Sequence, residues 1–125
     1  MKQQEEVILD TTKTMLVLTR GTAKFVYKRI DNLKAKEAYK VAMLACIDVL
    51  STGYKNISLI KLKILGIRED VNHLYPTMFL NPKRLEIASY SLACDQVLEI
   101  VNSLEARFIY GVNISDTTDA YNDEF

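Results

Sequence analysis

The sequence has few of the residues that interrupt helices, because its 125 positions include only two prolines and four glycines. Three of these six residues, Gly53, Pro76 and Gly111, fall where turns between long segments are expected. Proline and glycine are the strongest local markers of turns and loops. Their scarcity and placement predict long helices joined by short turns.

Cysteines and long apolar runs are scarce as well. Cys46 and Cys94 each lie in an apolar stretch, which is typical of reduced core thiols and not of a disulfide framework. The N-terminus, MKQQEEVILD, lacks the basic start and apolar core of a signal peptide. No run reaches the roughly 18 apolar residues of a membrane span. We therefore expect a cytoplasmic protein without a membrane partner.

Few residues are suited to catalysis or metal binding. The one histidine, His73, lies off the apolar stripe of its expected helix and is interpreted as a surface residue. One histidine and two cysteines 48 positions apart match no zinc-site spacing. Neither GxGxxG nor GxxxxGKS/T occurs in the sequence. We expect no catalytic residue, no metal site and no cofactor, and an enzyme is the third-ranked hypothesis.

The length fits one domain, and the charge within it is uneven. The chain has 16 basic and 16 acidic residues. Residues 1–112 contain 16 basic and 12 acidic residues, which gives a net charge of +4. Within them, residues 11–40 contain eight basic and two acidic residues, which gives a net charge of +6. The last ten residues contain the other four acids. The N-terminal part of the fold is therefore expected to be cationic.

Helical periodicity predicts the all-α class and, within it, an antiparallel four-helix bundle. The expected helices are residues 4–30, 34–52, 57–75 and 81–111, with loops at residues 31–34, 52–56 and 76–81. Gly21 is a weak point at which the first helix can bend or split. Asn81 and Pro82 suit the N-cap and first position of the last helix. The bundle is assigned to residues 1–112.

Residues 113–125 are expected to form a flexible, disordered acidic tail, because they are polar and lack periodicity. The simplest interpretation is a solubilising end. The alternatives are that its last residues, DAYNDEF, dock into a basic pocket of a partner, or that the tail folds back on the cationic part of the chain.

Apolar spacing identifies the faces of the last two helices that are expected to be buried. In the third helix the stripe is Ile57, Ile60, Ile64, Ile67, Val71 and Leu74. In the last helix an arc of Ile87, Tyr90, Cys94, Val97, Leu98, Val101, Leu104 and Phe108 lies opposite Arg84, Asp95, Glu99, Asn102 and Ala106.

The second and third helices carry more apolar surface than one bundle core needs. From Val41 to Leu50 only Asp48 is polar, so the second helix is expected at the centre of the bundle or shared with another subunit. Its side of small residues, Ala35, Ala38, Ala42, Ala45 and Cys46, allows a neighbouring helix to approach closely. The third helix has a second apolar row, made of leucines, which also has to be buried against another surface. The predicted homo-oligomer interface is Val41, Leu44, Ile47, Leu59, Leu62 and Leu65.

A row of cations follows the first helix at spacings of 7, 4 and 4: Lys13, Arg20, Lys24 and Lys28. Arg29, Lys34, Lys36 and Lys40 follow closely in the sequence, and Asp31 and Glu37 are the only acids among them. The ordinary interpretation is a solvated helix face. A row with so few acids is also suited to following a phosphate backbone. Tyr27 and Tyr39 lie beside it, either as interface residues or as platforms for unpaired bases.

The start of the last helix carries a resemblance to a known family. The residues are Asn81-Pro82-Lys83-Arg84-Leu85-Glu86-Ile87-Ala88-Ser89, after a helix that ends Leu74-Tyr75-Pro76. The pattern resembles the final-helix start in the small four-helix-bundle family that includes proteins encoded in 23S ribosomal RNA intervening sequences and the accessory variability determinant of diversity-generating retroelements. The resemblance runs over residues 8–110. It implies a pentameric barrel and, as in the retroelement members, a positively charged surface for a reverse transcriptase and its RNA.

These observations predict a non-enzymatic, homo-oligomeric accessory or adaptor protein. It would bind RNA or DNA, and a polymerase-type protein, through the face from Lys13 to Lys40. The alternative is a protein-interaction module, such as a phage-type inhibitor or virion adaptor, that uses the apolar faces of the second and third helices.

Overall fold

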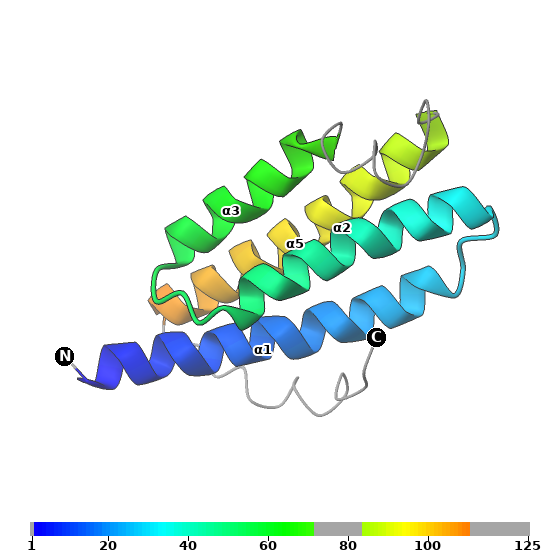
Figure 1. Cartoon of the computed structure of the whole chain (residues 1–125). Helices are drawn as coiled ribbons and strands as arrows, with labels where there is room; N and C mark the ends of the chain where they lie inside the picture. The colour runs from blue at the N-terminus through cyan, green and yellow to red at the C-terminus, as the bar shows by residue number, and fades with distance from the viewer. Residues whose placement is uncertain (1, 72–83, 111–125) are drawn as a thin grey trace.

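The computed structural model describes residues 2–71 and 84–110, and the side-chain environments of residues 10–71 and 84–106. Within these ranges the chain forms four α-helices: α1 (Lys2–Tyr27), α2 (Leu33–Ser51), α3 (Ile57–Glu69) and α5 (Arg84–Tyr110). Successive helices in this order run in opposite directions (Figure 1), and the described residues contain no strand. The predicted antiparallel four-helix bundle is confirmed.

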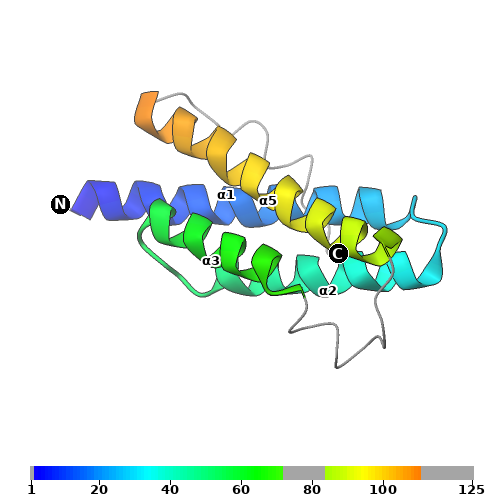
Figure 2. The ribbon, with the colours of Figure 1, turned by 90° about the horizontal axis from the view of Figure 1, so that it is seen from above.

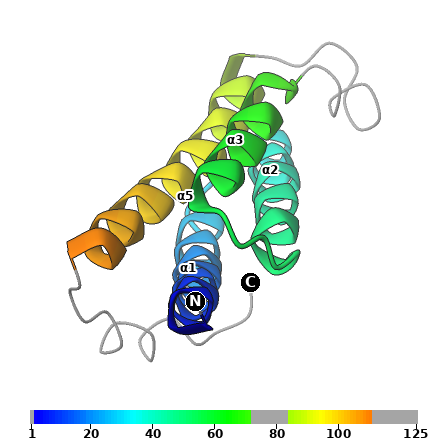
Figure 3. The same ribbon diagram turned by 90° about the vertical axis from the view of Figure 1, so that its left-hand side faces the viewer.

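The end-on view shows how the helices are arranged (Figure 3). The most extensive contact joins α2 and α5, and each of α1 and α3 packs against both of them. Helices α1 and α3 therefore lie on opposite sides of the central α2–α5 pair. Helix α5 runs obliquely to the other three (Figure 2).

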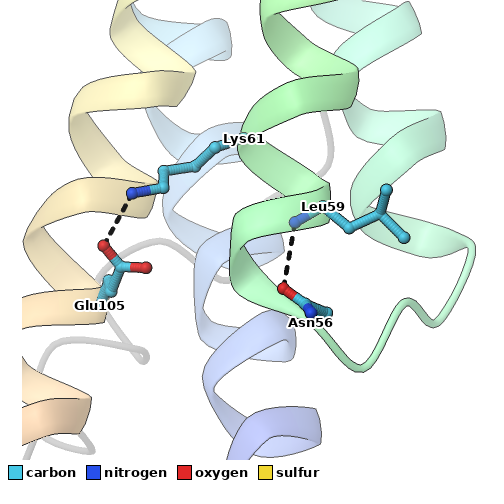
Figure 4. Close-up of polar contacts among 4 residues, drawn as sticks. All are labelled: Asn56, Leu59, Lys61 and Glu105. Carbon is cyan, nitrogen blue, oxygen red and sulfur yellow. Dashed lines mark hydrogen bonds and ion pairs between the residues drawn. The ribbon is translucent and has the colours of Figure 1, made fainter.

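The starts of α2 and α3 depend on asparagine caps. The side-chain oxygen of Asn32 accepts a hydrogen bond from the Ala35 amide at 3.0 Å, and that of Asn56 accepts one from the Leu59 amide at 3.2 Å (Figure 4). Each cap satisfies an amide that has no partner within the helix. Between these helices, Gly53 has φ +87°, in the left-handed region that glycine adopts without strain. The predicted turn at Gly53 is confirmed.

Two predicted helix ends are corrected. Helix α1 ends at Tyr27 and not at residue 30, because the amides of Arg29 and Ile30 bond to the carbonyls three residues earlier, in a tight final turn. Helix α3 ends at Glu69 and not at residue 75, because Asp70 leaves the helical conformation, with φ −93° and ψ 20°. Helix α1 continues through Gly21.

Several predictions lie outside the described residues. They are the loop at residues 76–81, the caps Asn81 and Pro82, the turn at Gly111, and the acidic tail of residues 113–125. The position of His73 lies outside as well.

The core is built from the predicted apolar faces. Ile57, Ile60 and Ile64 of α3 are buried, and Ile67 and Val71 pack partly buried against the same cluster. On α5, the buried members of the predicted arc are Tyr90, Cys94, Val97, Val101 and Leu104, whereas Arg84, Asp95, Glu99, Asn102 and Ala106 are exposed. The assignment of these two faces is confirmed for the described residues, whereas Leu74 and the side chain of Phe108 lie outside them.

Helix α2 is central but has an exposed outer face. Its small residues Ala35, Ala38, Ala42 and Cys46 are buried, whereas Ala45 is partly exposed. Leu44 and Asp48 are exposed on the other side. Asp48, the only polar residue from Val41 to Leu50, therefore lies on the exposed face of α2.

Candidate nucleic-acid interface

A cationic surface runs along α1 and continues onto α2. We call it the basic surface and define it as Lys13, Arg20 and Lys24 of α1, Lys28 directly after the end of α1, Lys36 and Lys40 of α2, and Tyr27, the last residue of α1. Lys13, Lys28 and Lys40 are exposed, and the other cations are partly buried. Helical spacing places Lys13, Arg20 and Lys24 on the side of α1 away from the buried Met15 and Thr19.

Tyr27 joins the two rows of cations. The Nζ atom of Lys36 lies 4.7 Å from the centre of the Tyr27 ring, and the Nζ atom of Lys40 lies 5.9 Å from it. Both distances are within the range in which a cation is attracted to the face of an aromatic ring. Tyr27 follows Lys24 by three positions and precedes Lys28 by one. The contact therefore brings α2 cations next to those at the C-terminal end of α1.

Arg29, although exposed, is turned toward Phe25. Its guanidinium carbon lies 3.5 Å from the centre of the Phe25 ring, and Nη1 donates a hydrogen bond to the Phe25 carbonyl at 2.9 Å. Lys34 is exposed in the first turn of α2. Phe25 is itself 58% exposed, a feature that the sequence reasoning missed. Phe25 lies two positions, or about 200° around the helix, from the buried Ala23, and this spacing was the available signal.

Tyr39 is buried and has no face open for stacking. Its hydroxyl donates a 2.6 Å hydrogen bond to Oε1 of Gln96 on α5. Burial, with a smaller contribution from the nearby Cys46 thiol, raises the pKa of Tyr39 above its usual value, so the phenol stays neutral. The interpretation of Tyr39 as a platform for unpaired bases is wrong, and it is a core residue.

Two cations of α3 form ion pairs with acids of α5. Lys61 of α3 forms a 2.8 Å ion pair with Glu105 of α5, drawn in Figure 4. Arg68 of α3 forms a 2.7 Å ion pair with Asp95 of α5. These pairs join α3 to α5. A third cation of α3, Lys63, lies over the Tyr54 ring at 5.9 Å. The acids near the basic surface, Asp31 and Glu37, are both exposed.

The predicted oligomer interface is divided between the surface and the core. Leu62 is 65% exposed, and Leu44, Leu59 and Leu65 are exposed as well. Val41 and Ile47 are partly buried and pack against the core cluster. The exposed part of the set is therefore one leucine on α2 and three on α3.

Two free cysteine thiols lie in the core. Cys46 and Cys94 are free and fully buried, and their thiols form a hydrogen bond across the α2–α5 contact. That bond, together with burial, raises the pKa of Cys46 and keeps the thiol protonated. Within the part of the chain that is described, no three His, Cys, Asp or Glu residues lie together as a metal site would require.

Comparisons of the chain with protein-family models, with curated proteins and with solved structures find no match. Among residues 2–71 and 84–110, no helix has the length and hydrophobicity needed to cross a membrane.

Proposed function

We propose that this four-helix bundle is a non-enzymatic accessory protein that binds nucleic acid through the basic surface. The observation that carries the proposal is the junction at Tyr27, where Lys36 and Lys40 of α2 meet the cationic row of α1. Two helices thus contribute to one surface, and its six cations can face one phosphate backbone.

The spacing of the cations suits a phosphate backbone. Residues four and seven positions apart on a helix are separated by about 6 and 10 Å along its axis. Each phosphate that a lysine or arginine neutralises releases counterions, and this release makes binding favourable and dependent on salt. The contacts carry no sequence information, so the basic surface is suited to RNA or DNA of any sequence.

The second part of the proposal is that the chain works as a homo-oligomer in the cytoplasm. The exposed leucines Leu44, Leu59, Leu62 and Leu65 support association between subunits. Val41 and Ile47, the other two residues of the predicted interface, are partly buried and pack against the core cluster. Two free thiols fit a reducing compartment. Following the family resemblance, we propose a polymerase-type protein, such as a reverse transcriptase, as the partner that shares the nucleic acid.

A charge-reversal experiment tests the basic surface. We expect Lys28→Glu combined with Lys40→Glu to lower the affinity for a fluorescent oligonucleotide by about tenfold or more, because each change replaces an attraction by a repulsion. The slope of log affinity against log salt concentration should become shallower by the amount expected for the loss of about two phosphate contacts. Fluorescence anisotropy over a series of salt concentrations measures both quantities.

The matched control is Lys63→Glu combined with Arg84→Glu, which changes the net charge equally but outside the basic surface. We expect this variant to bind nearly as tightly as the unchanged protein. An equal loss in both variants would show that only total charge matters. Salt-independent or absent binding by the unchanged protein would refute the proposal.

A second candidate function is a protein-interaction module, such as a phage-type inhibitor or virion adaptor. It is favoured by the exposed leucines of α2 and α3, which could hold a protein partner in place of another subunit. In that case Leu44→Lys abolishes partner binding, while reversal of Lys28 and Lys40 leaves it intact.

A further inference from the structure

The outer face of α3 is apolar and has no cover from the described residues. Leu59, Leu62 and Leu65 are 37%, 65% and 40% exposed. The isoleucines Ile57, Ile60 and Ile64 occupy the opposite face and are buried in the core. One short helix thus presents apolar side chains to the core and to solvent alike.

The outer face has a symmetric pattern centred on Leu62. Leu59 and Leu65 lie three positions on either side of it, turned by about 60° around the helix in opposite directions. Ser58 and Gly66 lie four positions on either side, turned by about 40°, and both are exposed. The pattern therefore reads alike from either end: small residue, leucine, leucine, leucine, small residue.

The residues seven positions on either side of Leu62 carry opposite charges, and Arg68 in the last turn of α3 is paired with Asp95. Lys55 precedes the N-cap and is exposed, whereas Glu69 and Asp70 at the C-terminal end are exposed acids. Lys55 and Glu69 are each seven positions from Leu62. A second α3 in the antiparallel direction would set each Lys55 beside the Glu69 of the other copy. A parallel copy would set like charges together.

We propose that two copies of this chain pair through α3, antiparallel about a twofold axis at Leu62. This inference rests on the proposed homo-oligomer and names its contact. At Leu62 the two side chains meet each other, and Leu59 of each copy lies level with Leu65 of the other. Ser58 lies level with Gly66, and these small residues allow the helices to approach to the usual 8 to 10 Å. The contact gives a dimer and not the pentamer that the family resemblance implies.

The association itself is tested with Leu62→Lys. Two lysines would meet at the axis in place of two leucines, so we expect self-association to weaken by about tenfold or more. Sedimentation equilibrium over a wide range of protein concentration measures this. The matched control is Leu92→Lys, which makes the same change at a leucine of α5 that is 44% exposed. We expect the control to remain a dimer.

The antiparallel direction is tested by disulfide trapping between two singly substituted chains, Ser58→Cys and Gly66→Cys. The glycine accepts a side chain, since no atom lies within 4 Å of where its Cβ would be. In the antiparallel pair, position 58 is level with position 66 of the other copy, whereas the two 58 positions are about 12 Å apart along the axis. With an added mild oxidant such as diamide, we expect disulfides only in the mixture.

Three outcomes would overturn the inference. They are a monomer at every concentration, disulfides within each single variant in place of the mixture, and equal loss of association in Leu62→Lys and Leu92→Lys. Binding of a short oligonucleotide by Leu62→Lys is measured in parallel. If that variant binds as the unchanged protein does, the basic surface is intact, so failure of the α3 contact is separated from failure of the nucleic-acid proposal.

Discussion

Tyr39 is a polar side chain placed in the centre of the bundle, and its ionisation links stability to pH. The folded protein raises its pKa by burial, so the folded state keeps the proton at alkaline pH values where the unfolded chain loses it. The contribution to stability is full below the ordinary tyrosine pKa of about 10 and declines as the pH rises above it.

We expect the effect of Tyr39→Phe on the free energy of unfolding to differ between pH 8 and alkaline pH. At pH 8 it should lower the free energy of unfolding by about 1 kcal/mol, because the hydrogen bond to Gln96 is lost. Above about pH 10 the decline in stability should be shallower than in the unchanged protein. The raised pKa of Cys46 leaves some decline in place. Urea unfolding at pH 8 and pH 11 measures the difference, and an equally steep decline would contradict the assignment.

The α2–α3 hairpin contains two glycines whose roles differ. Gly66 lies inside α3 with open space around it, and Gly53 turns the chain between the helices with φ +87°. We expect Gly66→Ala to stabilise the protein by about 0.5 to 1 kcal/mol, because alanine favours the helix and restricts the unfolded chain. Gly53→Ala should destabilise it by about 1 kcal/mol, because alanine is strained in the left-handed region.

Urea unfolding at a low protein concentration, at which association does not contribute, measures both variants. The pair forms its own control, since the same chemical change is made at a helical and at a left-handed position. Loss of stability in both variants would show that α3 does not tolerate a side chain at position 66.

At the scale of the whole fold, α1 and α3 lie on opposite sides of the α2–α5 pair (Figure 3). The basic surface is built on α1 and α2, whereas the leucine face belongs to α3. A dimer joined through α3 would therefore keep two basic surfaces open. We expect a long oligonucleotide that reaches both surfaces to bind more tightly than a short one, because the second contact becomes intramolecular. In Leu62→Lys this gain should disappear, while affinity for the short oligonucleotide remains. Anisotropy with two lengths of probe measures it, and a gain with length that survives in the variant would contradict the arrangement.

Much of the fold could be predicted from local patterns. The stripe of isoleucines on α3 and the apolar arc of α5 repeat with the period of a helix, so their buried faces follow from spacing alone. The row of cations on α1 could be found in the same way. The ends of α1 and α3 could not, because hydrogen bonds in the last turn and the dihedral angles of one residue decide them.

The sequence by itself determined the number of described helices, their directions and the apolar faces of α3 and α5, because these follow from helical period and from the short turns between the helices. Only the tertiary structure decided that Tyr39 is a core residue, that Asp48 is in solvent, and that Lys36 and Lys40 meet α1 at Tyr27. The reason is physical. Helical period orders side chains around one axis, whereas burial and contact depend on which neighbouring helix covers each side.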